Sequence, residues 1–113
     1  MTAPTTTLPT AVSDYFALSE GTDRAETIRV FVPDAHVTDD GHDYRGREKV
    51  LAWLNGPASE FETTSTRLSA ESTGDVTTVT DRLTGNFPGG QVDLRFAFTL
   101  DGSGLIQRLS ISV

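Results

Sequence analysis

The segment "QVDLRFAFTL", residues 91–100, carries the clearest secondary-structure pattern in the chain. Its large apolar side chains alternate with polar or small ones, and a period of two is typical of a strand with one buried face. The apolar positions are Val92, Leu94, Phe96, Phe98 and Leu100. We therefore expect a half-buried β-strand here.

The segments around this strand extend it into a sheet. Residues 101–104, "DGSG", are a turn signal. After them a second alternating run predicts a hairpin partner, with Leu105, Leu109, Ile111 and Val113 as its apolar positions. Upstream, residues 61–71 and 75–87 are rich in Thr, Ser and Val, and "GDV" and "FPGGQ" mark the turns between strands. We expect four long antiparallel strands after residue 59.

The first half of the chain predicts helices near residues 9–20, 23–32 and 46–55. Pro9 suits a first helical turn, Asp23 and Glu26 have the spacing of a capping box, and Pro33 ends the second run. Between the last two helices, residues 35–38 predict a short strand, and Asp40-Gly41 a turn.

Helices followed by an antiparallel meander predict an α+β fold in which the helices cover one face of a curved sheet. Residues 1–7 are rich in Thr and Pro and are expected to form a disordered tail, which leaves residues 8–113 as a single domain. A chain of 113 residues is long enough to bury a core without disulfides.

Composition excludes several function classes. The chain has no Cys, so thiolate metal sites and Cys nucleophiles are absent. Its net charge of −7 opposes binding to nucleic acid or to an anionic membrane. It lacks both a signal-peptide pattern and a run of ~18 apolar residues, so we expect a cytoplasmic protein. No phosphate-binding glycine loop or serine-hydrolase elbow is present, and no cofactor is expected.

Two long segments resemble one known superfamily. "AVSDYFALSEGTDRAETIRVFVPDAHVTDDGHDYRGREKVLAWL" is similar to the opening of nuclear transport factor 2-like, SnoaL-like polyketide cyclase domains, and "LTGNFPGGQVDLRFAFTLDGSGLIQRLSI" to their closing hairpins. The superfamily includes ketosteroid isomerase, limonene-epoxide hydrolase, polyketide cyclases and members that only bind. The resemblance implies a cone-shaped curved sheet covered by three N-terminal helices, but no particular function.

The resemblance also implies an apolar pocket for a hydrophobic small molecule between helices and sheet. Its expected lining residues could equally be plain core that fills the cone. They are Val12, Phe16, Val37, Trp53, Phe87, Leu94, Phe96 and Ile106.

Asp39 is the candidate catalytic residue. In ketosteroid isomerase the general base is an Asp just after the short strand that follows the second helix, and Asp39 in "HVTDDG" matches that position. The isomerase's tyrosine position falls on Asp14, next to Tyr15, and its acid position falls on Phe96, so steroid isomerisation itself is not implied. Asp39 also has a structural interpretation, as a turn residue that accepts backbone N–H groups while Gly41 takes a positive φ.

A base needs a partner that stabilises the anion it creates, and the candidates are Tyr15, His36 and His42. His36, Asp39 and His42 are three residues apart, but on a strand and turn that spacing scatters side chains, so no metal site is expected.

Two functions stay open. One is a cofactor-independent isomerase or cyclase with Asp39 as general base, and the other is a non-catalytic ligand-binding or dimeric interaction module. We also expect a two-fold homodimer, because relatives commonly dimerise through the outward face of these strands. The expected outward residues are Thr63, Thr78, Thr80, Arg95, Ala97 and Thr99.

Overall fold

The computed structural model describes residues 8–19, 24–39, 41–56 and 63–113. The predicted tail, residues 1–7, lies outside the described residues. The elements in chain order are α1 (Thr10–Ser19), the 3₁₀ helix η1 (Arg24–Val30), β1 (Phe31–Asp39), β2 (His42–Arg45), α2 (Arg47–Asn55), β3 (Thr63–Thr73), β4 (Val76–Gly85), β5 (Gln91–Leu100) and β6 (Ile106–Ser112).

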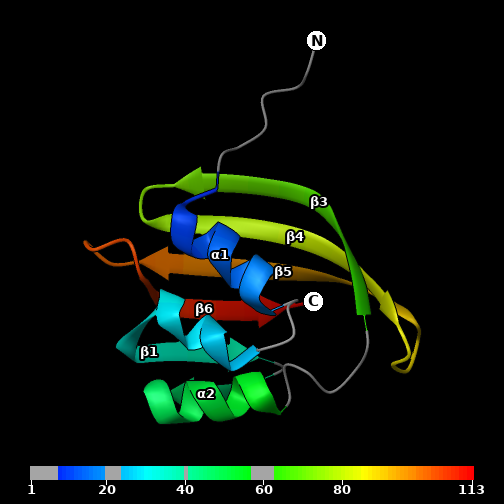
Figure 1. Ribbon diagram of the computed structural model, residues 1–113. Coiled ribbons are helices and arrows are strands. Elements are labelled where there is room, and N and C mark those ends of the chain that lie inside the picture. Colours follow the sequence, from blue (N-terminus) through cyan, green and yellow to red (C-terminus); the bar gives the residue numbers. More distant parts are fainter. Residues whose placement is uncertain (1–7, 20–23, 40, 57–62) are drawn as a thin grey trace.

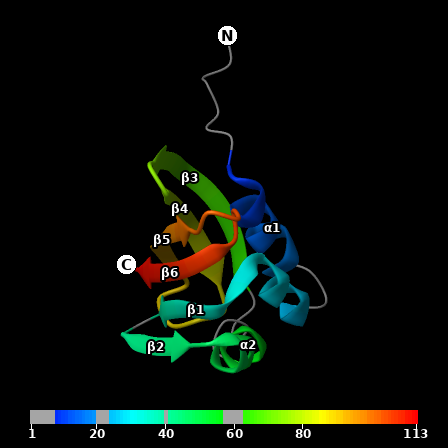
Figure 2. The same cartoon turned by 90° about the vertical axis from the view of Figure 1, so that its left-hand side faces the viewer.

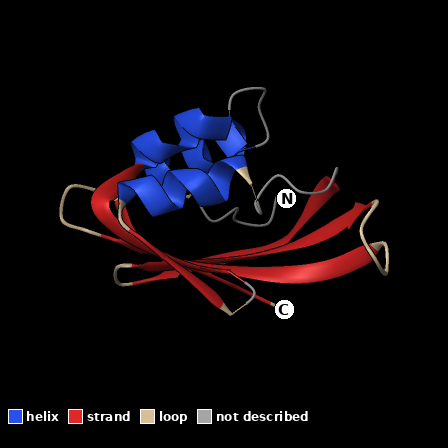
Figure 3. Ribbon diagram, turned by 90° about the horizontal axis from the view of Figure 1, so that it is seen from below, coloured by secondary structure: helices blue, strands red, loops and turns tan. Residues whose placement is uncertain are grey.

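The strands form one curved sheet in the order β2-β1-β6-β5-β4-β3 (Figure 1). Neighbouring strands are antiparallel except β1 and β6, which run parallel and join the first strand of the chain to its last. The three described helices cover the same face of the sheet, and among the described residues the other face carries no helix (Figure 3). The predicted α+β class and the four long strands after residue 59 are confirmed.

The alternation in residues 91–100 decides which side chains enter the core. Phe96 and Phe98 on β5 are buried and point toward α1, where Tyr15 and Phe16 meet them. The ring centroids of Tyr15 and Phe98 are 5.2 Å apart, and those of Phe16 and Phe96 5.3 Å, in edge-to-face geometry. Such edge-to-face pairs contribute about 0.5–1.5 kcal/mol each beyond the burial of their area, and so help to hold α1 on the sheet.

The second predicted helix differs from the structure at its end. We expected Phe31 and Val32 to be helical, and this prediction is wrong. Both residues begin β1 and are buried, and Phe31 pairs with Ile106 of β6. Pro33 lies inside this strand rather than stopping a helix. The pairing with β6 is irregular between Phe31 and His36, and such an irregularity tolerates a residue without an N–H. Figure 2 shows η1 running directly into β1.

The predicted alternation in the last strand also shifts. Ile106 is fully buried although it falls outside the apolar positions of the expected alternation, and Val113, which follows the strand, lines the pocket as an inward residue but is 96% exposed. The pairing of β5 with β6 slips between Thr99 and Leu100, which turns Ile106 inward beside Leu100. A register slip of one residue exchanges the two faces of a strand.

Asp101 closes the turn between β5 and β6. Its Oδ1 atom accepts hydrogen bonds from the Ser103 hydroxyl at 2.6 Å and from the backbone N–H groups of Ser103 and Leu105 at 2.9 and 3.1 Å. The bond from the Ser103 side chain contributes most to holding the pKa of Asp101 below its ordinary value. The carboxylate therefore stabilises this hairpin when it is charged.

We expect Asp101→Ala to lower the free energy of unfolding at pH 7. Because the folded state lowers the pKa of Asp101, its contribution is present above the ~3.9 of a free Asp and is lost as the pH falls through the folded value. In urea titrations at each pH, the difference between native chain and variant should therefore begin to shrink near the pKa of a free Asp and continue to shrink as the pH falls through the lower folded pKa. An equal difference at every pH would contradict this role.

Candidate functional site

A pocket of about 1070 Å³ opens between the helices and the inner face of the sheet. This volume lies slightly above the range of most small-molecule sites, about 300–1,000 Å³. Aromatic and aliphatic side chains, two carboxylates and several small polar side chains line it. The lining includes Tyr15, Phe16, Asp39, Trp53, Leu54, Asp81, Leu83, Phe87, Val92, Leu94, Phe96 and Ile111, with Ser19, Thr63, Thr64, Ser65, Gln91 and Ser112 among the polar residues.

The structure separates the residues expected to line the pocket into two groups. Phe16, Trp53, Phe87, Leu94 and Phe96 do line it. The other three, Val12, Val37 and Ile106, are 0% exposed and belong to the core instead. They occupy inward positions where helix and sheet pack directly on each other, which leaves no cavity beside them.

Asp39 ends β1 on its inner face and lines the pocket, where it is half-buried. The indole N–H of Trp53 donates a hydrogen bond of 2.9 Å to its Oδ2 atom. Among the described residues, nothing hydrogen-bonds its Oδ1 atom. The turn after it has the expected glycine, with φ of 77° at Gly41. A carboxylate with one anchored oxygen and one unpartnered oxygen faces a largely apolar cavity.

Tyr15 enters the same pocket from α1. Burial, followed by the negative charges of Asp39 and Asp81, raises the pKa of its phenol, so the side chain stays a neutral O–H donor. Within the described part of the chain, no side chain or backbone group hydrogen-bonds this hydroxyl. Tyr15 thus offers an unused donor close to both carboxylates.

Asp81 on β4 and Arg67 on β3 were not among the predicted site residues. Asp81 lines the pocket, is 2% exposed, and accepts a 2.6 Å hydrogen bond from Nε of Arg67. The Arg67 guanidinium also lies over the Phe16 ring, 4.6 Å from its centroid. The alternation of Thr77, Val79 and Asp81 along β4 could have revealed Asp81 as an inward carboxylate. Nothing in the sequence pairs it with Arg67.

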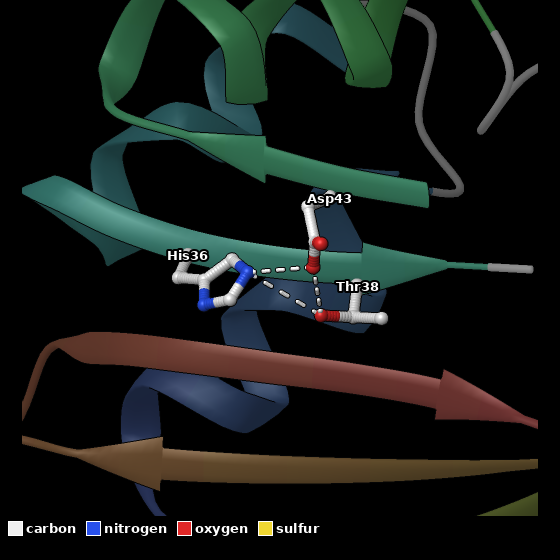
Figure 4. A network of polar contacts seen from close by, with 3 residues as sticks. All are labelled: His36, Thr38 and Asp43. Atoms are coloured by element: carbon white, nitrogen blue, oxygen red, sulfur yellow. Dashed lines mark hydrogen bonds and ion pairs between the residues drawn. The ribbon is translucent and has the colours of Figure 1, made fainter. Parts of the chain in front are cut away.

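The histidines do not join this site. His42 lies opposite Asp39 in the β1–β2 ladder, but it is exposed and does not line the pocket. His36 is on the outer face, where its Nε2 is 2.8 Å from Oδ1 of Asp43 and Thr38 donates to the same oxygen at 3.0 Å (Figure 4). The ladder thus places His36 and Asp39 on opposite faces of β1. Across the described ranges, no cluster of three His, Asp or Glu residues is placed to hold a metal.

Comparisons with known proteins agree with this architecture. No protein-family model matches the chain, and no curated protein matches it. Among solved structures, a candidate polyketide cyclase from Sinorhizobium meliloti is 31% identical over 93% of this chain and 95% of its own, with a TM-score of 0.85.

Two more distant structures share the fold. A ketosteroid isomerase-like protein from Catenulispora acidiphila, in complex with trimethylamine, is 22% identical over 95% of this chain and 87% of its own, with a TM-score of 0.80. A Mycobacterium tuberculosis protein in complex with estradiol-17β-hemisuccinate is 20% identical, covers 91% and 90% of the two chains, and has a TM-score of 0.74.

Fold and pocket together define a class, the cone-shaped α+β proteins in which helices and a curved sheet enclose a cavity. The chain belongs to the nuclear transport factor 2-like superfamily, among its SnoaL-like polyketide cyclase and ketosteroid isomerase-like members. No helix in the described ranges is long and apolar enough to cross a membrane.

Proposed function

We propose that this protein is a cofactor-independent isomerase or cyclase that takes a proton from an apolar carbonyl compound. The observation that supports this most is the meeting of Asp39 and Tyr15 in one pocket. Asp39 offers a carboxylate oxygen without a described partner, and Tyr15 offers a neutral donor without one. A base and a hydrogen-bond donor on opposite ends of an enolisable group are the minimum that enolisation needs.

The proposed step conserves charge inside the pocket. A C–H bond next to the ligand carbonyl breaks, its proton goes to Oδ1 of Asp39, and its electron pair moves onto the carbonyl oxygen. That oxygen then accepts the hydrogen bond of Tyr15. Asp39 loses its negative charge as the ligand gains one, and the ion pair of Asp81 with Arg67 stays neutral throughout. Return of the proton at another carbon completes an isomerisation, whereas attack of the carbanion on a second carbonyl closes a ring.

Relatives support the ligand class. The Sinorhizobium meliloti structure is a candidate polyketide cyclase, and the Mycobacterium tuberculosis protein holds a rigid, largely apolar steroid ester. A lining of aromatic rings with several polar side chains among them suits the same chemistry here, an apolar ring system with oxygen substituents.

Deuterium exchange tests this function without knowledge of the natural substrate. The probe is 2-tetralone, an apolar bicyclic ketone with acidic protons beside its carbonyl. The native chain should speed deuterium uptake from D₂O beyond buffer alone, with saturation in 2-tetralone. Saturable binding of 2-tetralone without faster exchange would instead favour the second candidate, a non-catalytic ligand-binding module, because the pocket would then bind a ligand without catalysing a reaction.

We also propose that the chain forms a two-fold homodimer through the helix-free face of the sheet. Thr78, Thr80, Ala97 and Thr99 lie half-buried on this face, as expected. Thr63 was expected there too, but it lines the pocket. It lies before the register shift between Arg67 and Ser69, so it faces inward together with Ser65.

Light scattering at micromolar concentration should report twice the mass of one chain. Ala97 lies between Thr78 and Ser110 in the middle of the outer face, so Ala97→Arg should produce a monomer because its charge would be buried in the interface. Leu68→Arg, at an exposed position of the edge strand β3, serves as the control. A native monomer would overturn the proposed dimer.

A further inference from the structure

We propose that Trp53 is a positioning residue for the Asp39 base, and that its neutral N–H leaves this carboxylate free to take up a proton. The inference rests on the proposed function. It assigns a chemical role to a residue that the sequence presents only as an apolar pocket wall, and it explains why one of the two pocket carboxylates, and not the other, serves as the base.

The indole is held rigidly. Trp53 is 1% exposed and lies on the buried face of α2, and the Tyr44 ring of β2 stands 6.2 Å from it, centroid to centroid. The helix itself is anchored where it starts, because the N–H of Gly46 donates a 2.8 Å hydrogen bond to the carbonyl of Ala35 on β1. The donor and the carboxylate that it holds are therefore attached to the same part of the sheet.

The hydrogen bond to one oxygen of Asp39 restricts the orientation of its whole carboxylate group. Because the indole N–H holds Oδ2 at 2.9 Å, the carboxylate cannot rotate freely, and Oδ1 is the oxygen left without a donor among the described residues of this pocket-lining side chain. An indole N–H is a donor only, so it cannot compete for the incoming proton. Holding a base near its productive orientation matters, since a misplacement of about 1 Å can cost about a hundred-fold in rate.

The two pocket carboxylates differ in the donor that holds them. Asp81 is bound by the guanidinium of Arg67, and its protonation would leave that cation without its counter-charge. Asp39 is bound by a neutral donor, so its protonation strands no charge. The charged donor ties Asp81 into an ion pair, whereas the neutral donor leaves Asp39 as the carboxylate better suited to act as the base.

The chain offers a clean experiment, because Trp53 is its single tryptophan. Growth on β-(3-benzothienyl)alanine replaces the indole N–H by sulfur at this position alone and nearly preserves the shape of the ring. We expect kcat for 2-tetralone exchange to fall about ten- to hundred-fold with little change in KM. Trp53→Phe, which also removes the indole N–H, should likewise lower kcat with little change in KM.

A spectroscopic readout separates positioning from simple packing. In ¹H–¹⁵N spectra of the native chain, the one indole resonance should shift during an acid titration as Asp39 becomes protonated. This pH-dependent shift of the indole resonance should vanish in Asp39→Asn. It should persist in Asp34→Asn, which changes an exposed Asp on the same strand.

Three results would overturn the inference. If exchange is lost in Asp39→Asn but kept with the isostere, Trp53 does not position the base, while the proposed function survives. If the indole resonance ignores both pH and Asp39→Asn, the hydrogen bond does not operate in solution. If the native chain catalyses no exchange at all, the proposed function fails, and the positioning role fails with it.

Discussion

The Asp39→Asn variant should lose catalysed exchange of 2-tetralone by about 10²–10⁴-fold, the contribution of a positioned general base. Asn keeps the volume of Asp and can still accept the Trp53 hydrogen bond, but its amide cannot take up the proton. The fold should persist, because Asp39 is only half-buried and makes one side-chain hydrogen bond among the described residues. Mass spectrometry of the ketone after timed incubation in D₂O measures the rate.

Two comparisons make this result specific. Asp34→Asn on the same strand should leave the exchange rate unchanged, since Asp34 is exposed and lies outside the pocket. The Asp39→Asn protein should still bind 2-tetralone, as judged by the fluorescence of Trp53. An Asp39→Asn variant that exchanges as fast as the native chain would show that another group is the base.

The second large effect concerns stability. Arg67→Met should lower the free energy of unfolding by about 2–4 kcal/mol, because it leaves the Asp81 carboxylate buried without its partner. The loss of one member of a buried ion pair typically costs about 3–5 kcal/mol. We expect a smaller loss here because Arg67 is partly exposed. Met keeps an apolar side chain next to Phe16, but it also removes the cation–π contact of the guanidinium with that ring. Urea titration followed by circular dichroism measures the change.

A second Arg–Asp ion pair, between β4 and β5, serves as a control for the Arg67–Asp81 pair. Arg82 and Asp93 are joined by two hydrogen bonds, but both side chains are largely exposed. Arg82→Met should therefore leave the stability nearly unchanged. If both variants lose the same stability, burial of Asp81 is not the cause. In Arg67→Met/Asp81→Leu, which removes both charges, much of the loss should be recovered.

The fold was largely predictable because its strongest signals are local. Alternation in residues 91–100 placed Phe96 and Phe98 in the core, and Gly46 and Gly56 bracket α2. The errors fall where tertiary pairing overrides local pattern. Phe31 and Val32 join the sheet because β6 supplies an edge for them, and that edge comes from residues near the other end of the chain.

The candidate site was predictable only in part. Asp39 and Tyr15 were found through the resemblance, and the structure brings both to the pocket. The hydrogen bond of Trp53 to Asp39 spans fourteen residues, and that of Arg67 to Asp81 also spans fourteen, so neither follows from local periodicity. His42 was a candidate partner of Asp39, but on the short strand β2 its side chain is exposed and does not line the pocket.

The most direct test of the account is a titration of ¹⁵N-labelled protein with 2-tetralone, followed by ¹H–¹⁵N spectra. The account predicts saturable shifts of the Trp53 indole and of backbone amides around the pocket, such as those of Tyr15, Asp39 and Phe96, with outer-face residues such as Thr38 and Arg95 nearly unaffected. Shifts that never saturate, or that gather on the outer face, would contradict a ligand site beneath the sheet.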